Sequence, residues 1–421
     1  MSKTQKSNIL PIAVMFLLFF MIAFVTNLAG SMGVIVKNQY GVSNTLSQLG
    51  TFANFIAYAC MGVPAGILLK RKGYKFTSLA AVLVGLVGVA IQWISGPAQS
   101  FAVYVLGAFI AGFSMCMLNV VVNPMLNTLG GGGNRGNQLC LFGGSCNSIG
   151  GTITPILVGY LVGGSIDTAQ VGDAAPVMII AIVAFALAAV VIFFTDIPEP
   201  HMETAEEKKL RMSGNAPKDP HSPLSFRHFV LGALAIFFYV GVEVGIPNFA
   251  NLFMSQDPNV GPAVAGTVVS IYWLLMLCGR LLGGSIGGKV SAKAMLSIVS
   301  CIGLIFMLLI MFLPIDMTLD LFGKSLPVSM LFVMLAGLCT SVMWGNIFNL
   351  AAEGLGKYTP AASGIFMALV CGGGILPLIQ GAIADHVGMM FSYIVPALAL
   401  AYILFYALVG SKNVNEDIPT A

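Results

Sequence analysis

Glu243 is the carboxylate that lies deep inside a long apolar run of this sequence, and no acidic residue precedes Asp167. An ionised side chain at the centre of a membrane helix costs about 2.5–3.5 kcal/mol on insertion scales. Burial favours the neutral form of a carboxyl group. A bound proton gives that form, and a bound hard cation such as sodium compensates the charge of the carboxylate. We interpret Glu243 as a cation-coupling and ligand-binding residue. The alternative is a neutral glutamic acid that holds two helices together.

Amide and aromatic side chains recur in the other apolar runs. Amides supply the paired donors and acceptors that a neutral polyol needs, and aromatic rings offer flat apolar faces to the C–H face of a sugar ring. The early runs contain no buried Arg or Lys, which favours a neutral ligand over an anion. Each amide alone could instead bond one helix to another. With Glu243, the candidate substrate-binding residues are Asn27, Asn119, Asn147, Tyr239, Asn248, Trp273, Trp344, Asn346 and Gln380.

Small residues followed by basic ones end two of the apolar runs. The first ends in GVPAGILLKRKGYK and the second in GRLLGGSIGGKVSAK. Since both patterns fall at the expected cytoplasmic face, they predict a gating motif there. Its residues are Gly66, Lys70, Arg71, Arg280 and Lys289.

The elements that must position these side chains are membrane helices. Of the 421 residues, 57% are hydrophobic and 8% are charged, against about a quarter charged in a soluble domain. This composition excludes a soluble enzyme and a nucleic-acid binder. About 20 apolar residues span the bilayer core. Twelve runs qualify: Ile9–Gly33, Leu46–Leu69, Phe76–Ile94, Phe101–Asn123, Leu139–Val162, Pro176–Phe194, Phe229–Phe253, Pro262–Ile286, Ala294–Leu313, Val328–Ala351, Pro360–Ala384 and Phe391–Leu408.

The basic residues set the orientation. If the N-terminus is cytoplasmic, Lys37 and Lys324 are the only two of 19 Lys and Arg residues outside, so the positive-inside rule places both termini in the cytoplasm. The first run is long and lacks a small-residue cleavage site, so we expect a retained span. We predict an N-terminal six-helix bundle over 1–195, a cytoplasmic linker over 196–227, and a C-terminal six-helix bundle with a short tail over 228–421.

An internal repeat relates the two halves. The motif G-x-x-x-P-x-x-x-G begins at Gly151 and again, 222 positions later, at Gly373. Two six-helix halves in parallel repeat, each with inverted sub-repeats, are the organisation of major facilitator transporters, which bind substrate at the midplane between the halves. The fold class predicted is therefore all-α integral membrane with 12 transmembrane helices.

Enzymatic signatures are missing from the sequence. The apolar runs contain no His/Asp, Ser/His or metal-ligand cluster, and no G-x-x-x-x-G-K-[ST] motif occurs. We expect no catalytic residue, no metal and no cofactor other than a co-transported proton or sodium ion. All eight cysteines fall in apolar runs, so we predict no disulfide framework. Transport would be gradient-driven or passive.

Several longer strings resemble the fucose permease and glucose/galactose permease family. They are VPAGILLKRKGYK, NVVVNPMLNTLG, CNSIGG, FFYVGVEV, WGNIFNLAAEGLG and SGIFMALVCGGGILPLIQGAIAD. The resemblance implies a sugar:cation symporter of the major facilitator fold in the bacterial inner membrane. In the proton-coupled fucose permease, carboxylates in spans one and four bind proton and sugar; here Gly30 and Asn119 take their positions. Asn147 matches the family asparagine of span five, and Glu243 matches the glucose/galactose-type relatives.

The function predicted is import of a monosaccharide such as glucose, galactose, mannose or fucose by alternating access, coupled to a proton or to sodium. The alternatives are a passive uniporter, an N-acetylhexosamine carrier, a drug or lipid exporter, or a membrane sensor. We expect a monomer whose partners are a neutral sugar and the lipid bilayer, with no nucleic acid.

Overall fold

The structure is a computed structural model, and it describes residues 9–42, 46, 49–161, 170–213, 220–255, 257, 260, 262–415 and 417–420. The first eight residues, whose cytoplasmic placement is predicted above, lie outside the described residues, as do 214–219 of the predicted linker.

Five long helices build the N-terminal bundle: α2 (Ile9–Tyr40), α4 (Leu49–Ser95), α5 (Phe101–Leu129), α6 (Gly133–Leu161) and α7 (Ala175–Phe194). Helix α4 contains two of the predicted spans. Its 47 residues would extend about 70 Å at 1.5 Å per residue, more than twice the bilayer core. The helix is interrupted at Gly73, whose φ of 83° is in a region that L side chains rarely adopt.

The short helix α8 (Ala205–Met212) follows in the linker, and the C-terminal bundle is more broken. It comprises η2 (Pro223–Ser225), α9 (Arg227–Ser255), α10 (Pro262–Ile286), α11 (Ala292–Phe312), α12 (Ser329–Ser341), α13 (Met343–Ala352), η3 (Gly356–Tyr358), α14 (Thr359–Ala368), η4 (Leu369–Cys371), α15 (Gly372–Val387), η5 (Phe391–Tyr393), α16 (Ile394–Phe405) and η6 (Tyr406–Gly410). Two antiparallel strands, β1 (Thr318–Leu321) and β2 (Lys324–Pro327), form a hairpin between α11 and α12.

These helices account for the twelve predicted crossings. Among the described residues, ten helical segments are long and apolar enough to span a membrane. Helix α4, one of the ten, supplies two crossings. Helix α6 adds the twelfth, although its many Gly, Asn and Ser residues make it less apolar than the others.

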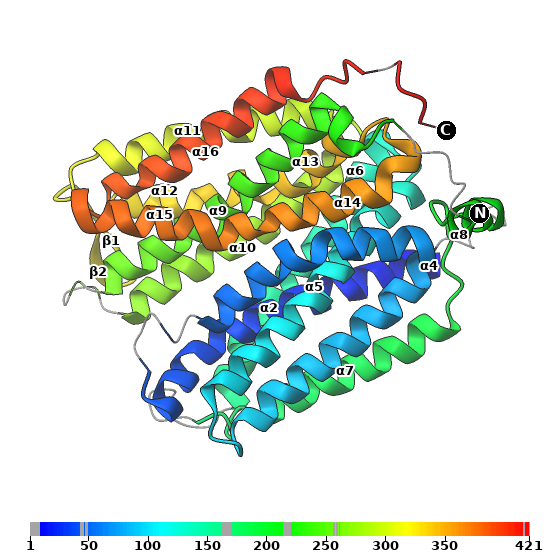
Figure 1. Ribbon diagram of the computed structural model, residues 1–421. Coiled ribbons are helices and arrows are strands. Elements are labelled where there is room, and N and C mark those ends of the chain that lie inside the picture. Colours follow the sequence, from blue (N-terminus) through cyan, green and yellow to red (C-terminus); the bar gives the residue numbers. More distant parts are fainter. Residues whose placement is uncertain are drawn as a thin grey trace.

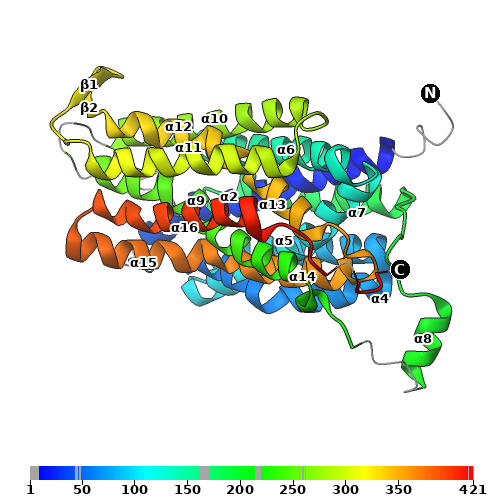
Figure 2. The ribbon, with the colours of Figure 1, turned by 90° about the horizontal axis from the view of Figure 1, so that it is seen from above.

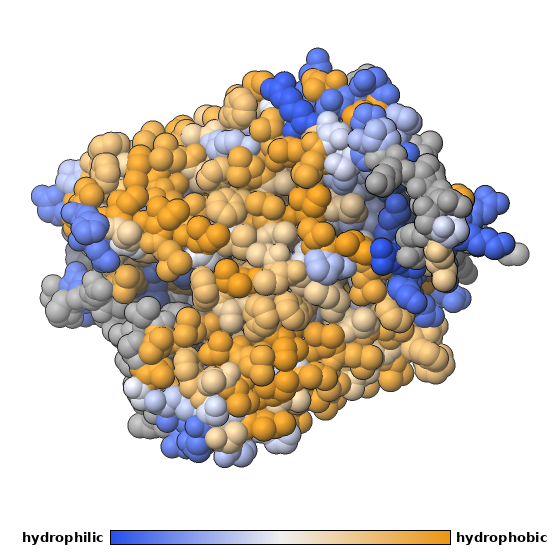
Figure 3. All heavy atoms as spheres, viewed as in Figure 1, coloured by the Kyte–Doolittle hydropathy of each residue, from blue (hydrophilic) through white to orange (hydrophobic). Residues whose placement is uncertain are grey.

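The two bundles lie side by side with their helices running between the same two ends of the molecule (Figure 1). The linker face is the end that carries α8 and residues 411–415 and 417–420, whereas the hairpin face is the opposite end, which carries β1 and β2 (Figure 2). An apolar surface covers the helices between these ends, and hydrophilic residues gather at the ends themselves (Figure 3). Phe194 and Phe312 are 79% and 70% exposed on helices, as expected of side chains that face lipid.

Close backbone contact joins the bundles near the linker face. A Cβ atom added at Gly62 of α4 would lie 2.5 Å from the carbonyl oxygen of Gly364 in α14, and one at Gly66 would lie 2.6 Å from that of Pro360. Small residues therefore let the two helices touch. Lys70, Arg71 and Lys289 are exposed, and the backbone of Lys70 bonds the linker at Glu203.

Candidate binding site

A cavity of about 250 Å³ lies between the two bundles. Pockets for drug-sized ligands measure about 300–1,000 Å³, so this volume suits a smaller molecule. Its walls come from α2, α4, α5 and α6 of one bundle and α9, α10, α12, α13 and η4 of the other. The lining residues are Phe19, Ile22, Ala23, Thr26, Asn27, Thr51, Phe55, Tyr58, Asn119, Cys140, Leu141, Gly144, Asn147, Val240, Glu243, Val244, Asn248, Trp273, Arg280, Ser341, Trp344, Gly345 and Val370.

Most of the candidate substrate residues line this cavity. Seven of the ten do so: Asn27, Asn119, Asn147, Glu243, Asn248, Trp273 and Trp344. They come from six helices and from both halves of the chain, which places polar groups on opposing walls.

The other three candidates are not among the residues that line the cavity, and their binding role stays a prediction. Tyr239 is fully buried and packs edge-on against Trp344, with ring centroids 6.2 Å apart. Asn346 accepts a hydrogen bond of 2.8 Å from Asn137. Gln380 is buried against Gly245 of α9. All three side chains are buried inside the protein.

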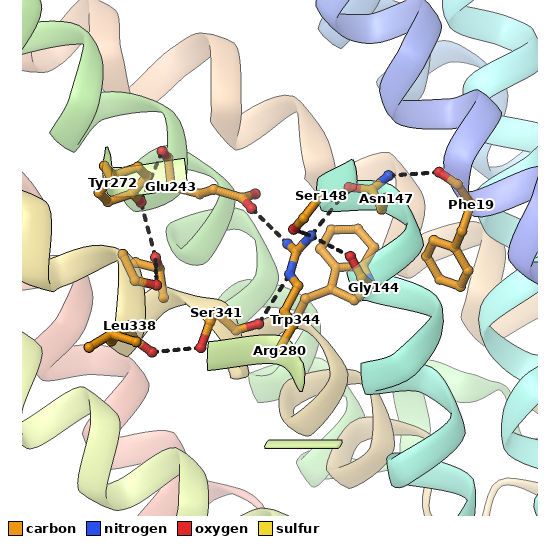
Figure 4. Close-up of polar contacts among 12 residues, drawn as sticks. Phe19, Gly144, Asn147, Ser148, Glu243, Tyr272, Arg280, Leu338, Ser341 and Trp344 are labelled. Carbon is orange, nitrogen blue, oxygen red and sulfur yellow. Dashed lines mark hydrogen bonds and ion pairs between the residues drawn. The ribbon is translucent and has the colours of Figure 1, made fainter. Parts of the chain in front are cut away.

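Arg280 also departs from its predicted position at the cytoplasmic face. It is 6% exposed and lines the cavity, where its Nη2 lies 3.1 Å from Glu243 Oε1 (Figure 4). Arg280 precedes the end of α10 by six residues, or about 9 Å along the helix. Its long side chain points into the protein, where it bonds the carboxylate of Glu243 and the backbone carbonyl oxygens of Gly144 and Ser341.

The other N–H groups of the Arg280 guanidinium donate to acceptors in both bundles. Nη1 donates to Gly144 O at 2.8 Å, to Ser148 Oγ at 2.7 Å and weakly to Asn147 Oδ1 at 3.4 Å. Nε donates to Ser341 O at 3.3 Å. These partners satisfy the fork of N–H groups that an arginine carries.

An amide network forms another part of the wall. Asn119 donates to Tyr58 Oη at 3.0 Å, and Asn123 donates to Asn119 O at 3.0 Å. The indole of Trp344 donates from Nε1 to Asn123 Oδ1 across the bundle interface at 3.0 Å. Asn147 is held by donation to Phe19 O at 3.1 Å. The network fixes these amides in place without introducing charge.

The cavity is closed on the linker side. Between the cavity and the linker face, two hydrogen bonds of 2.8 Å join the bundles. Asn127 donates to Asn349, and Asn137 donates to Asn346. On the other side the lining reaches Thr51, in the first turn of α4. Since α4 runs from the hairpin face to Gly73 near the linker, the cavity extends toward the hairpin face.

Sequence reasoning missed several wall residues. They are Tyr58, Thr26, Thr51 and Ser341. Residues of these types are common in apolar helices, and their spacing forms no motif that indicates a binding site. Arg280 carried a signal, because it is a basic residue preceding the end of a span, but that signal also fits a side chain that reaches the membrane surface.

Comparisons with known proteins agree with this architecture. The sequence profile of the Major Facilitator Superfamily matches residues 14–376. The "Glucose/galactose transporter" of Brucella abortus is 33% identical over 420 residues, covering 98% of this chain and 97% of that protein. The "L-fucose-proton symporter" of Escherichia coli is 22% identical over 434 residues, covering 98% and 95%. The resemblance drawn from the motifs is confirmed.

Solved structures share the fold. A crystal structure of the transporter FucP in the outward conformation has a TM-score of 0.81 at 21% identity, covering 97% of this chain and 100% of that chain. The proton:xylose symporter XylE has a TM-score of 0.73 at 13% identity, covering 98% of both chains. At these identities the likeness shows the fold alone, and it confirms the predicted all-α fold class.

Proposed function

The chain belongs to the Major Facilitator Superfamily of membrane transporters, and we propose that it takes up a neutral monosaccharide, a hexose or deoxyhexose, by alternating access coupled to a proton or sodium. The observation that carries the proposal is the cavity between the bundles, lined by amides, two tryptophans and one ion pair. The substrate names of the relatives at 33% and 22% identity support the same class.

A neutral ligand follows from the charges of the wall. Arg280 and Glu243 compensate one another at 3.1 Å, so the site offers no net charge to a substrate ion. The amides of Asn119, Asn147 and Asn248 supply hydrogen bonds that suit hydroxyl groups. Trp273 and Trp344 supply apolar faces for a sugar ring.

The linker face is the cytoplasmic one in this proposal, because exposed basic residues cluster there in accord with the positive-inside rule. The structure then corresponds to a state closed to the cytoplasm, with the cavity extending outward. The protein acts as a monomer in a bacterial inner membrane, where rocking of the bundles exposes the same site to either side.

Glu243 is the coupling residue in this account. One charge that moves through about 100 mV gains about 2.3 kcal/mol, which at 1.4 kcal/mol per decade corresponds to about 50-fold accumulation of sugar. A proton or a sodium ion bound at Glu243 would carry that charge.

A passive uniporter is the second candidate, and the ion pair favours it. Because Arg280 already neutralises Glu243, the carboxylate needs no imported cation to remain in the membrane. A uniporter would equilibrate sugar without accumulating it.

Uptake of labelled hexoses, deoxyhexoses and N-acetylhexosamines into proteoliposomes, under separately imposed proton and sodium gradients, tests the proposal. We expect accumulation of one hexose or deoxyhexose with one gradient. Equilibration with every gradient would establish the uniporter. Accumulation of an N-acetylhexosamine alone would show that the substrate is an N-acetylated amino sugar and not a hexose or deoxyhexose. Transport of none of these sugars would refute the proposed function.

A further inference from the structure

Arg280 belongs to the C-terminal bundle but makes three of its contacts with the other one. It extends from α10, and its Nη1 donates to Gly144 O, Ser148 Oγ and Asn147 Oδ1 of α6. A Cβ atom added at Gly144 would lie 3.4 Å from Arg280 Cδ, which is an ordinary van der Waals distance, so the arginine side chain passes directly beside this part of α6. Arg280 therefore bridges the two bundles at the cavity wall.

The same guanidinium holds Glu243. Nη2 pairs with Glu243 Oε1 at 3.1 Å, and Nη1 is the atom that contacts α6. A guanidinium is rigid and planar, so its two terminal nitrogens move together. A change at Glu243 therefore acts on the contact with Ser148, although these two side chains belong to different bundles.

We propose that Arg280 is the positioning residue that links occupancy of Glu243 by a cation to closure of the linker side. The inference rests on the proposed function and deepens it, because it assigns the step that turns cation binding into bundle movement. The charged and titratable side chains facing Glu243, among the described residues, are Arg280, Tyr272 of α10, which donates to the Glu243 carbonyl at 3.3 Å, and Tyr239 one turn away in α9.

The step proceeds by charge compensation. In the cation-free state, the carboxylate of Glu243 and Arg280 neutralise each other, and the guanidinium stays on α6. When a proton or sodium ion neutralises Glu243, Arg280 becomes a buried charge without a counter-ion, which is strongly unfavourable. It then leaves Gly144 and Ser148 for water, and one of the contacts that holds the linker side closed is lost.

Linkage gives a quantitative consequence. If closure and cation binding oppose each other, a change that weakens closure strengthens the apparent cation binding by up to the same factor. Ser148→Ala removes the 2.7 Å contact but keeps the charge pair. We expect it to lower the cation concentration for half-maximal sugar uptake by about fivefold. Ser145→Ala is the matched control, because Ser145 lies on the same helix and bonds only Leu141 O among the hydrogen bonds seen.

A second measurement separates accumulation from exchange. Arg280→Gln removes the charge, so in proteoliposomes we expect sugar accumulation to fall to a ratio near one, and counterflow to slow as well because Arg280 lines the cavity. Lys293→Gln, at an exposed position near the start of α11, serves as the control and should accumulate sugar like the wild type. If Arg280→Gln loses all transport, the double variant Glu243→Gln with Arg280→Gln should regain counterflow.

The outcomes distinguish this inference from the proposed function. No sugar transport by the wild type would refute the function itself. Accumulation by the wild type together with undiminished accumulation by Arg280→Gln would overturn the inference alone. An unchanged half-saturating cation concentration in Ser148→Ala would also overturn it, whereas the fivefold fall would support it.

Discussion

Trp344 of α13 and Asn123 of α5 are joined by a hydrogen bond of 3.0 Å that crosses from one bundle to the other. Trp344 also lines the cavity, so one side chain serves as a wall of the site and as part of its closure. A substrate that contacts the indole would therefore meet the same ring that joins the bundles.

Trp344→Phe should keep an aromatic face but leave Asn123 Oδ1 without its donor. A buried acceptor that loses its partner costs about 1–3 kcal/mol, so we expect the closed state to weaken and the half-saturating sugar concentration for counterflow to rise about tenfold. Trp93→Phe is the control, since Trp93 is 39% exposed on α4. Identical half-saturation in both variants would contradict this assignment.

Gly62→Val should block closure of the linker side. The added side chain would meet the Gly364 carbonyl oxygen, which lies 2.5 Å from a Cβ atom at this position, and backbone atoms of α14 cannot turn aside as a side chain can. We expect counterflow to slow about tenfold or more. Gly266→Val is the matched control, because a Cβ atom there meets nothing within 4 Å. Equal rates for the two variants would show that α4 and α14 need not touch.

Glu243→Gln and Arg280→Gln should each destabilise the folded protein more than the double variant does. Their side chains are 16% and 7% exposed, and breaking a buried pair costs about 3–5 kcal/mol because one charge remains uncompensated. Thermal unfolding in detergent measures the effect. If the shift in midpoint temperature of the double variant equals the sum of the shifts of the two single variants, the two charges do not compensate each other in the folded state.

The apolar runs predicted the twelve crossings because a membrane helix needs only sufficient length and few charges. Seven candidate polar residues reached the cavity because polar side chains in membrane helices turn toward the protein interior. The sequence could not place Tyr239, Asn346 and Gln380, since a small rotation of a helix decides whether a side chain meets the cavity or a neighbouring helix. Arg280 was misplaced because its partner Glu243 lies 37 positions away, on another helix.

His201 should make stability depend on pH near the linker face. It follows α7, its Nδ1 lies 2.7 Å from Tyr74 Oη, and burial lowers its pKa below the usual value of 6.5. The unfolded chain therefore binds a proton that the folded one resists, so stability is full above about pH 6.5 and falls as the pH drops. His201→Gln should flatten the decline of the melting temperature between pH 7 and 5, and the exposed His386→Gln should not. Equal declines in wild type and His201→Gln would exclude this residue as a source.

Sugar accumulation by Glu243→Gln shows whether this carboxylate couples sugar uptake to a cation gradient. Wild-type protein in proteoliposomes should accumulate the transported sugar under its coupling gradient, up to about 50-fold for one charge at about 100 mV, and Glu353→Gln, at an exposed glutamate near the linker face, should do the same. For Glu243→Gln we expect an accumulation ratio near one with counterflow retained. Uphill accumulation by Glu243→Gln equal to that of the wild type would contradict it.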